Sequence, residues 1–95
     1  MSEKAMARAH VVVRGKVQGV FFRAETQRAA EERKVTGWVR NRPDGTVEAM
    51  FEGTEKSVFS MVEWCKGGSP QATVEAVEAD WSEYRGEFAG FEITH

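Results

Sequence analysis

The stretch TGWVRNRPDGTVEAMFEG, residues 36–53, places two β-prone segments on either side of a turn sequence. Pro43 presets the backbone angle that the second position of a β-turn requires, and Gly45 is a common turn residue. After the turn, Val47, Ala49 and Phe51 alternate with other residues, so one face of this segment should be buried and the other wet. The stretch therefore predicts a β-hairpin.

A helical pattern precedes the hairpin. One face of the pattern is mostly small, and its residues repeat at helical spacing: Phe22, Thr26, Ala29, Ala30 and Arg33. The remaining charged residues of the segment lie on the other face, which is left for water. Lys34 is expected to close this helix near its negative end. The pattern predicts a helix with one mostly small face and one solvated face.

A second helical pattern follows the hairpin. Thr54 can cap the first N–H groups of this helix. The apolar positions that repeat at helical spacing are Val58, Phe59, Val62 and Cys65. Lys66 followed by two glycines predicts the end of the helix.

The outer parts of the chain predict further strands. AHVVVR, residues 9–14, is short and β-branched, and Val77, Ala79 and Trp81 alternate with polar residues. A short fifth strand around Phe91 and Ile93 is an option. The order strand, helix, strand, strand, helix, strand predicts an α+β, ferredoxin-like sandwich with both helices packed on one face of an antiparallel sheet. We expect a short N-terminal tail, residues 1–7, and a single domain, residues 8–95.

Composition narrows the class of protein. The chain has 95 residues, of which 41% are hydrophobic and 29% charged, as in ordinary globular domains. It has no apolar run long enough to span a membrane, and its charged opening lacks a secretory signal, so we expect a cytoplasmic protein. The one cysteine, Cys65, is expected to be a buried packing residue, and His10 and His95 lie at opposite ends of the sequence. We therefore expect no metal site and no cofactor.

The formal charge of −2 hides a division along the chain. Residues 1–42 carry a net charge of +6 and residues 43–95 a net charge of −8. These charges are either scattered and solvated, or they gather positive potential near residues 15–23 and 38–45, where it could attract a small anion. A sequence pI near 5.7 argues against a broad nucleic-acid surface.

The segment GKVQGVFFR, residues 15–23, precedes the first predicted helix without a capping residue. Val20 and Phe21 cannot accept the first N–H groups of the helix, so these donors and those of the loop are left for an anion. Arg23, in the first helical turn, can grip two oxygens of one phosphoryl group. An ordinary connection, with Arg23 in a surface ion pair with Glu25, is the alternative.

Two separated blocks make the anion site the better interpretation. GKVQGVFFR, followed about fifteen residues later by GWVRNRPDGTVEA, resembles the acylphosphatase family, and the resemblance extends from about residue 8 to 93 with the same element order. It implies metal-free hydrolysis of small acyl phosphates to carboxylate and inorganic phosphate, by in-line attack of water. The chain ends FEITH, whereas the family often ends in an arginine-containing strand, so the resemblance does not extend to a terminal arginine contact.

The resemblance also implies roles for individual residues. Arg23 and Asn41 would be the catalytic residues, with Arg23 binding the substrate phosphate and Asn41 positioning the attacking water. The backbone amides that would bind the phosphate with Arg23 belong to Gln18, Gly19, Val20, Phe21 and Phe22. Without the resemblance, Asn41 would be taken for a turn residue before Pro43, and Asp44 is expected to serve the turn rather than catalysis.

Two other classes of function compete with the enzyme. One is a noncatalytic anion-binding module, like the acylphosphatase-like part of hydrogenase maturation proteins; such a module normally belongs to a much larger chain, so a chain of this length favours the enzyme. The other is an RNA-binding ferredoxin-like domain, which needs stacking aromatics on two strands. The first strand has none, and Phe51 is on the face expected to be buried. We expect a monomer that binds no nucleic acid and no membrane, and the acyl group of its substrate is not readable from the sequence.

Overall fold

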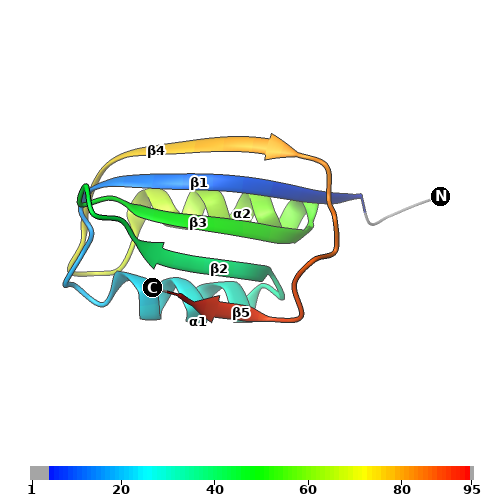
Figure 1. Ribbon diagram of the computed structural model, residues 1–95, viewed down its shortest axis with the longest axis horizontal. Coiled ribbons are helices and arrows are strands. Elements are labelled where there is room, and N and C mark those ends of the chain that lie inside the picture. The colour runs from blue at the N-terminus through cyan, green and yellow to red at the C-terminus, as the bar shows by residue number, and fades with distance from the viewer. Residues whose placement is uncertain (1–4, 95) are drawn as a thin grey trace.

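The computed structural model describes residues 5–94, and they form the predicted α+β, ferredoxin-like sandwich (Figure 1). The first half of the sandwich contains β1 (Met6–Lys16), α1 (Phe22–Glu32) and β2 (Thr36–Asn41). The second half contains β3 (Val47–Thr54), α2 (Glu55–Gly67), β4 (Thr73–Ser82) and a short β5 (Phe91–Ile93). Neither described helix is long and apolar enough to cross a membrane.

The five strands form one sheet in the order β4-β1-β3-β2-β5. Four of them pair antiparallel, but β5 runs parallel to β2, so the expectation of a purely antiparallel sheet is wrong at this edge. The chain leaves β4 at one end of the sheet, crosses that end and enters β5 from there (Figure 1). The direction of β5 is therefore opposite to that of β4 and the same as that of β2.

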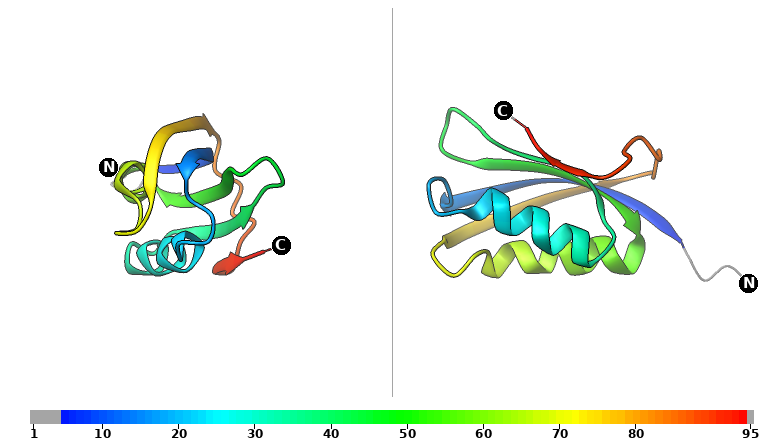
Figure 2. Two further views of the ribbon diagram at one scale, coloured as in Figure 1. Left: turned by 90° about the vertical axis from the view of Figure 1, so that its left-hand side faces the viewer. Right: turned by 90° about the horizontal axis from the view of Figure 1, so that it is seen from below.

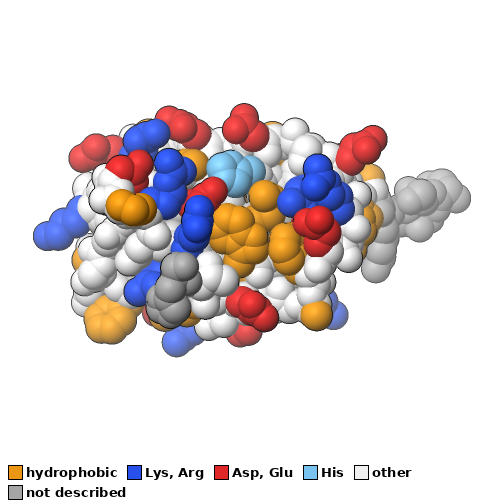
Figure 3. Space-filling model, in the orientation of Figure 1, with side chains coloured by type: hydrophobic (Ala, Val, Ile, Leu, Met, Phe, Trp, Pro, Cys, Tyr) orange, Lys and Arg blue, Asp and Glu red, His pale blue; other side chains and the backbone are white. Residues whose placement is uncertain are grey.

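Both helices cover the same face of the sheet, and the opposite face is open (Figure 2). The hydrophobic core lies between sheet and helices, and includes Val47, Ala49 and Phe51, as the alternation of the hairpin predicts. The open face carries apolar side chains near its centre and charged side chains around them (Figure 3).

The helical patterns are confirmed except at single positions. Four of the five predicted face residues of α1 are buried, but Arg33 lies just beyond the helix, where its Nε donates to Ser60 Oγ of α2 at 3.0 Å. Lys34 also lies after the helix, so it does not close it as expected. In α2, Phe59 is 58% exposed and Met61 is fully buried instead, since each residue turns the helix by 100° and Phe59 falls outside the inward stripe. Thr54 caps α2, accepting from the N–H of Ser57 at 3.2 Å.

The N-terminal boundary differs from the sequence expectation. Met6 and Ala7, placed in the tail of residues 1–7, pair with Thr54 and Gly53 at the start of β1. Residues 1–4 of that tail, and His95, lie outside the described residues. The division of the chain into tail and single domain stays a prediction.

A buried carboxylate anchors the long connection between β4 and β5. Glu52, on the hairpin face expected to be wet, is 0% exposed. It accepts hydrogen bonds from Arg8 Nη1 at 2.9 Å and from the N–H groups of Arg85 at 2.8 Å and Glu87 at 3.2 Å. Burial opposes ionisation of Glu52, but these donors outweigh it and hold its pKa below the ordinary value. The carboxylate thus fixes the path that brings the chain to β5.

Candidate active site

A pocket of about 340 Å³ lies at the start of α1. We call it the loop pocket, and its lining residues come from the loop, from α1, from the end of β2 and from β5: Val17, Gly19, Phe21, Phe22, Arg23, Ala24, Asn41 and Ile93. Five of the seven residues predicted for the site are therefore gathered around one hollow. Gln18 and Val20 do not line it.

The loop before α1 offers unused backbone donors. In residues 5–94, the N–H groups of residues 18–21 donate to no protein hydrogen bond, and α1 has no side-chain cap, as predicted. Two residues of the loop adopt left-handed backbone conformations, Gly19 with φ 74° and Phe21 with φ 60°. Left-handed angles in a short loop turn successive N–H groups toward a common side, which is how backbone anion sites are built.

Gly15 fixes where this loop begins. The pairing of β1 with β4 shifts register between Arg14 and Gly15, and a Cβ at Gly15 would lie 2.2 Å from the carbonyl oxygen of Thr73. Only glycine allows the two strands to approach this closely. The close approach holds the base of the loop against β4.

Arg23 lines the loop pocket from the first turn of α1. Within the described part of the chain it takes part in no ion pair, so the alternative of a surface ion pair with Glu25 is not formed. Its half-buried guanidinium is the one charged side chain among the described lining residues. The arrangement leaves its donors for an anion.

Asn41 is the last residue of β2 and faces the same hollow. Its side-chain oxygen Oδ1 is buried and, among the described residues, has no hydrogen-bond partner. Buried polar atoms are rarely left unpaired in folded proteins. An unpaired acceptor in a pocket suits a bound water molecule or a substrate donor.

The adjoining turn is built without Asn41. The N–H of Gly45 donates to the carbonyl of Arg42 at 3.1 Å, and Asp44 Oδ1 accepts from Thr46 Oγ1 at 2.6 Å and from its N–H at 3.0 Å. The hydroxyl and then the N–H of Thr46 are the main causes that lower the pKa of Asp44. Asp44 is therefore a turn residue, as expected.

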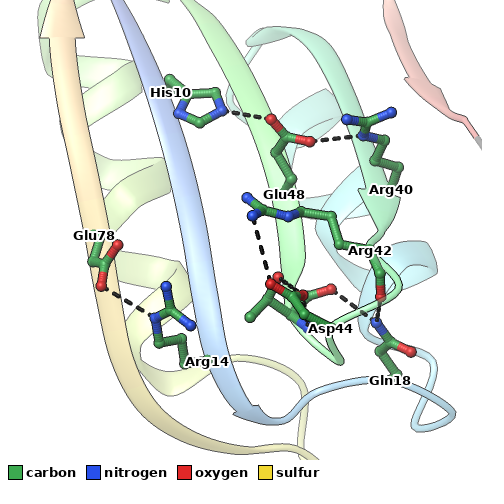
Figure 4. A network of polar contacts seen from close by, with 9 residues as sticks. His10, Arg14, Gln18, Arg40, Arg42, Asp44, Glu48 and Glu78 are labelled. Carbon is green, nitrogen blue, oxygen red and sulfur yellow. Dashed lines mark hydrogen bonds and ion pairs between the residues drawn. The ribbon is translucent and has the colours of Figure 1, made fainter.

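Gln18 ties the loop to this turn. Its Nε2 donates to the carbonyl oxygens of Arg42 and Thr46, each at 2.8 Å (Figure 4). Val20, the other residue outside the loop pocket, accepts a hydrogen bond from Ser69 Oγ at 3.2 Å through its carbonyl. The side chain of Gln18 thus has a holding role that its predicted place among the phosphate-binding amides did not suggest.

Three lining residues were not predicted from the sequence: Val17 and Ala24, which lie beside the predicted loop residues, and Ile93, which lies far from them in the chain. Ile93 reaches the pocket because β5 is held on several sides: Phe91 stacks on Phe51 with ring centroids 5.8 Å apart, and its carbonyl accepts from Gln27 of α1 at 3.0 Å. The N–H of Thr94 donates to the carbonyl of Val39 at 2.9 Å. Ile93 lies about 70 residues from Arg23 in the chain, so no local pattern could connect them.

This chain is similar in sequence and structure to known proteins. The family model described as Acylphosphatase matches residues 9–93. A curated acylphosphatase of Pelotomaculum thermopropionicum is 58% identical over 87 residues, which cover 92% of this chain and 95% of that protein.

Two solved structures have a fold similar to that of this chain. An acylphosphatase from Coxiella burnetii superposes with a TM-score of 0.90 at 38% identity and covers 99% of this chain and 100% of that one. T. kodakarensis HypF superposes with a TM-score of 0.79 at 29% identity, covering 97% of this chain but 12% of that one. From the family match over nearly its whole length and the 58% identical relative, this chain belongs to the acylphosphatase family, whose function is the hydrolysis of acyl phosphates.

Proposed function

We propose that this protein hydrolyses small acyl phosphates in the loop pocket, with Arg23 and the amides of residues 18–22 holding the phosphoryl group and Asn41 aligning the attacking water. The observation that carries the proposal is the meeting of three features at one hollow. These are the Arg23 guanidinium, a loop with unused N–H groups, and the unpaired oxygen of Asn41.

The reaction needs few protein groups. The water oxygen forms a bond to phosphorus while the bond from phosphorus to the acyl oxygen breaks, and the products are a carboxylate and inorganic phosphate. Phosphoryl transfer depends mainly on positioning and charge stabilisation. The leaving carboxylate belongs to an acid with a pKa of about 4, so it departs without being protonated.

The side chains at the pocket match these needs. Arg23 offers paired donors to the charge that spreads over the phosphoryl oxygens. Asn41 Oδ1 accepts a hydrogen bond from the water and orients it, but an amide cannot remove a proton. The proton of the water therefore passes to a phosphate oxygen of the substrate, which leaves in the product phosphate.

Benzoyl phosphate hydrolysis in the presence of a chelator tests the proposal. Arg23→Ala should lower kcat/KM roughly a hundredfold or more, as when one preorganised oxyanion donor is removed. Arg28→Ala, an exposed arginine on the same helix, is the matched control and should keep the wild-type rate. Near-normal turnover by Arg23→Ala would contradict the assignment.

A noncatalytic anion-binding module is the second candidate. This candidate is supported by the structural similarity to T. kodakarensis HypF, in which the matching part makes up 12% of a much longer chain. A module of this kind would bind inorganic phosphate in the loop pocket but would not turn over benzoyl phosphate. The same assay, with phosphate binding measured by calorimetry, separates the two functions.

The location, oligomeric state and partners predicted from the sequence belong to the same proposal. We place the protein in the cytoplasm as a monomer that binds no nucleic acid. Phe51 is 0% exposed and stacks on Phe91, so this aromatic is not available to stack on a base. Light scattering after size-exclusion chromatography tests the monomer, and titration with single-stranded RNA tests the absence of nucleic-acid binding.

A further inference from the structure

The loop pocket is larger than a phosphoryl group. Its volume is about 340 Å³, whereas one water molecule takes up roughly 30 Å³ of the liquid. A phosphorus and three oxygens fill only part of this space. The rest can receive the acyl part of the substrate.

The remaining wall of the pocket is apolar. Ile93, partly buried, lines it from β5, and the side chains of Phe21 and Ala24 are exposed at its edge. Among the described lining residues the single charged side chain is Arg23, which the proposed function assigns to the phosphoryl group. An acyl group with its own carboxylate would lose water here without gaining a cation, which is unfavourable.

The conformation of Phe21 supports a role at this wall. Its backbone lies in the left-handed region, at φ 60° and ψ 19°, which is uncommon for a bulky residue. Its side chain is 71% exposed, so core packing does not account for an aromatic residue here. Strained residues of this kind cluster at ligand-binding sites.

We propose that Phe21 and Ile93 form an acyl-binding wall, that this wall selects acyl phosphates with an uncharged, apolar acyl group, and that Ile93 is its specificity-determining residue. The inference rests on the proposed function and leaves the bonds made and broken unchanged. Ile93 contacts the acyl group from one side while Arg23 holds the phosphoryl group.

Three substrates test the wall: benzoyl, acetyl and succinyl phosphate. Because their intrinsic reactivities differ, each substrate is compared between wild type and variant. Ile93→Ala should lower kcat/KM for benzoyl phosphate about tenfold, the effect expected when apolar contact is removed from a specificity pocket. The value for acetyl phosphate should fall much less, because its methyl group touches little of the wall.

A charged variant tests the exclusion of carboxylates. Ile93→Lys should raise the kcat/KM ratio of succinyl to benzoyl phosphate about tenfold, since the new ammonium can pair with the free carboxylate. Glu92 is the exposed neighbour of Ile93 on β5, and Glu92→Ala is the control. It should leave the kcat/KM ratio of succinyl to benzoyl phosphate unchanged. Inhibition by inorganic phosphate should be the same in Ile93→Ala as in wild type, because the groups proposed to hold phosphate, Arg23 and the loop amides, are unchanged.

The possible failures are distinct. If Ile93→Ala lowers kcat/KM for all three substrates equally and also weakens inhibition by phosphate, Ile93 only maintains the shape of the site. The proposed acyl-binding wall is then wrong. A wild type that favours succinyl phosphate over benzoyl phosphate also overturns the wall, while leaving the proposed hydrolysis intact. If wild type hydrolyses none of the three, the proposed function falls and the wall with it.

Discussion

Arg23 and Asn41 face one pocket with different chemical abilities. Arg23 supplies charge, and Asn41 supplies an oriented acceptor that has no partner among the described residues. The two side chains come from separate elements, the first turn of α1 and the end of β2. Their substitutions should therefore affect different kinetic quantities.

Asn41→Ala should lower kcat for benzoyl phosphate about a hundredfold, because the attacking water loses its alignment. Inhibition by inorganic phosphate should stay close to wild type, since Arg23 and the loop amides are unchanged. Steady-state kinetics with phosphate as competitor measures both. If phosphate inhibition weakens while kcat persists, Asn41 is a binding residue instead.

Phe21→Gly should change the free energy of unfolding by no more than about 1 kcal/mol, because relief of the left-handed strain offsets the greater freedom of glycine in the unfolded chain. Phe22→Ala, at the buried neighbour, is the contrast and should cost about 3–5 kcal/mol. Urea unfolding of both variants measures these changes. A large loss in Phe21→Gly would show that the exposed ring supports the fold.

At the scale of elements, one side chain connects the loop of residues 15–23 to the hairpin turn. Gln18 Nε2 donates to the carbonyl oxygens of Arg42 and Thr46 (Figure 4). Asn41, the last residue of β2, directly precedes that turn. The loop that should hold phosphate and the strand end that should hold water are thus fixed relative to each other. In-line attack of water on phosphorus depends on the distance between the loop and the end of β2.

Gln18→Ala should lower the free energy of unfolding by about 1–2 kcal/mol, the usual net value of two neutral hydrogen bonds. It should also weaken phosphate inhibition several-fold, because the loop is no longer held. Gln27→Ala is the matched control, since its Nε2 donates one hydrogen bond to Phe91 of β5, away from the loop. It should cost stability but leave phosphate inhibition unchanged; equal weakening in both variants would refute a specific role for Gln18.

At the scale of the whole molecule, charged pairs hold the open face of the sheet. Arg8 Nη1 donates to Glu52 and, at 2.8 Å, to Glu87, and Glu48 pairs with His10 at 2.6 Å and Arg40 at 2.7 Å. Burial opposes ionisation of Glu48, but His10 and Arg40 outweigh it and lower its pKa. The partly buried Glu48 and the buried Glu52 of β3 thus both have a pKa below the ordinary value of 4.5 in the folded chain.

This shift sets the direction of the pH dependence. A carboxyl group with a lowered pKa in the folded state stabilises the fold above its unfolded pKa, and this contribution is lost as the pH falls through the folded pKa. The free energy of unfolding should therefore decline from about pH 4.5 downward, the ordinary value of both groups. Urea unfolding between pH 7 and pH 3 measures it.

Glu52→Gln isolates the contribution of Glu52 to the pH dependence of stability. At pH 7 the variant should be less stable by about 3 kcal/mol, because the amide cannot accept from all the donors that meet there. Its stability should fall less steeply below pH 4.5 than that of wild type. Glu92→Gln, an exposed carboxylate on β5, is the control; parallel curves for wild type and Glu52→Gln would show that Glu52 does not control the acid transition.

The sequence by itself determined the parts of this protein that neighbouring residues decide. The uncapped start of α1, the turn at residues 42–45, the Thr54 cap and the inward alternation of Val47, Ala49 and Phe51 all follow from spacings of a few residues. Arg23 and Asn41 could be expected at one site because the two blocks that contain them resemble the acylphosphatase family, and both line the loop pocket. Backbone angles, caps and alternation are local, so they can be predicted without knowing the fold.

Only the tertiary structure decided which distant residues meet. It placed Ile93 at the pocket, buried Glu52 under the connection to β5, and set β5 parallel to β2. These outcomes depend on the route of the chain across the end of the sheet and on which faces remain to be covered, and apolar periodicity carries no information about either.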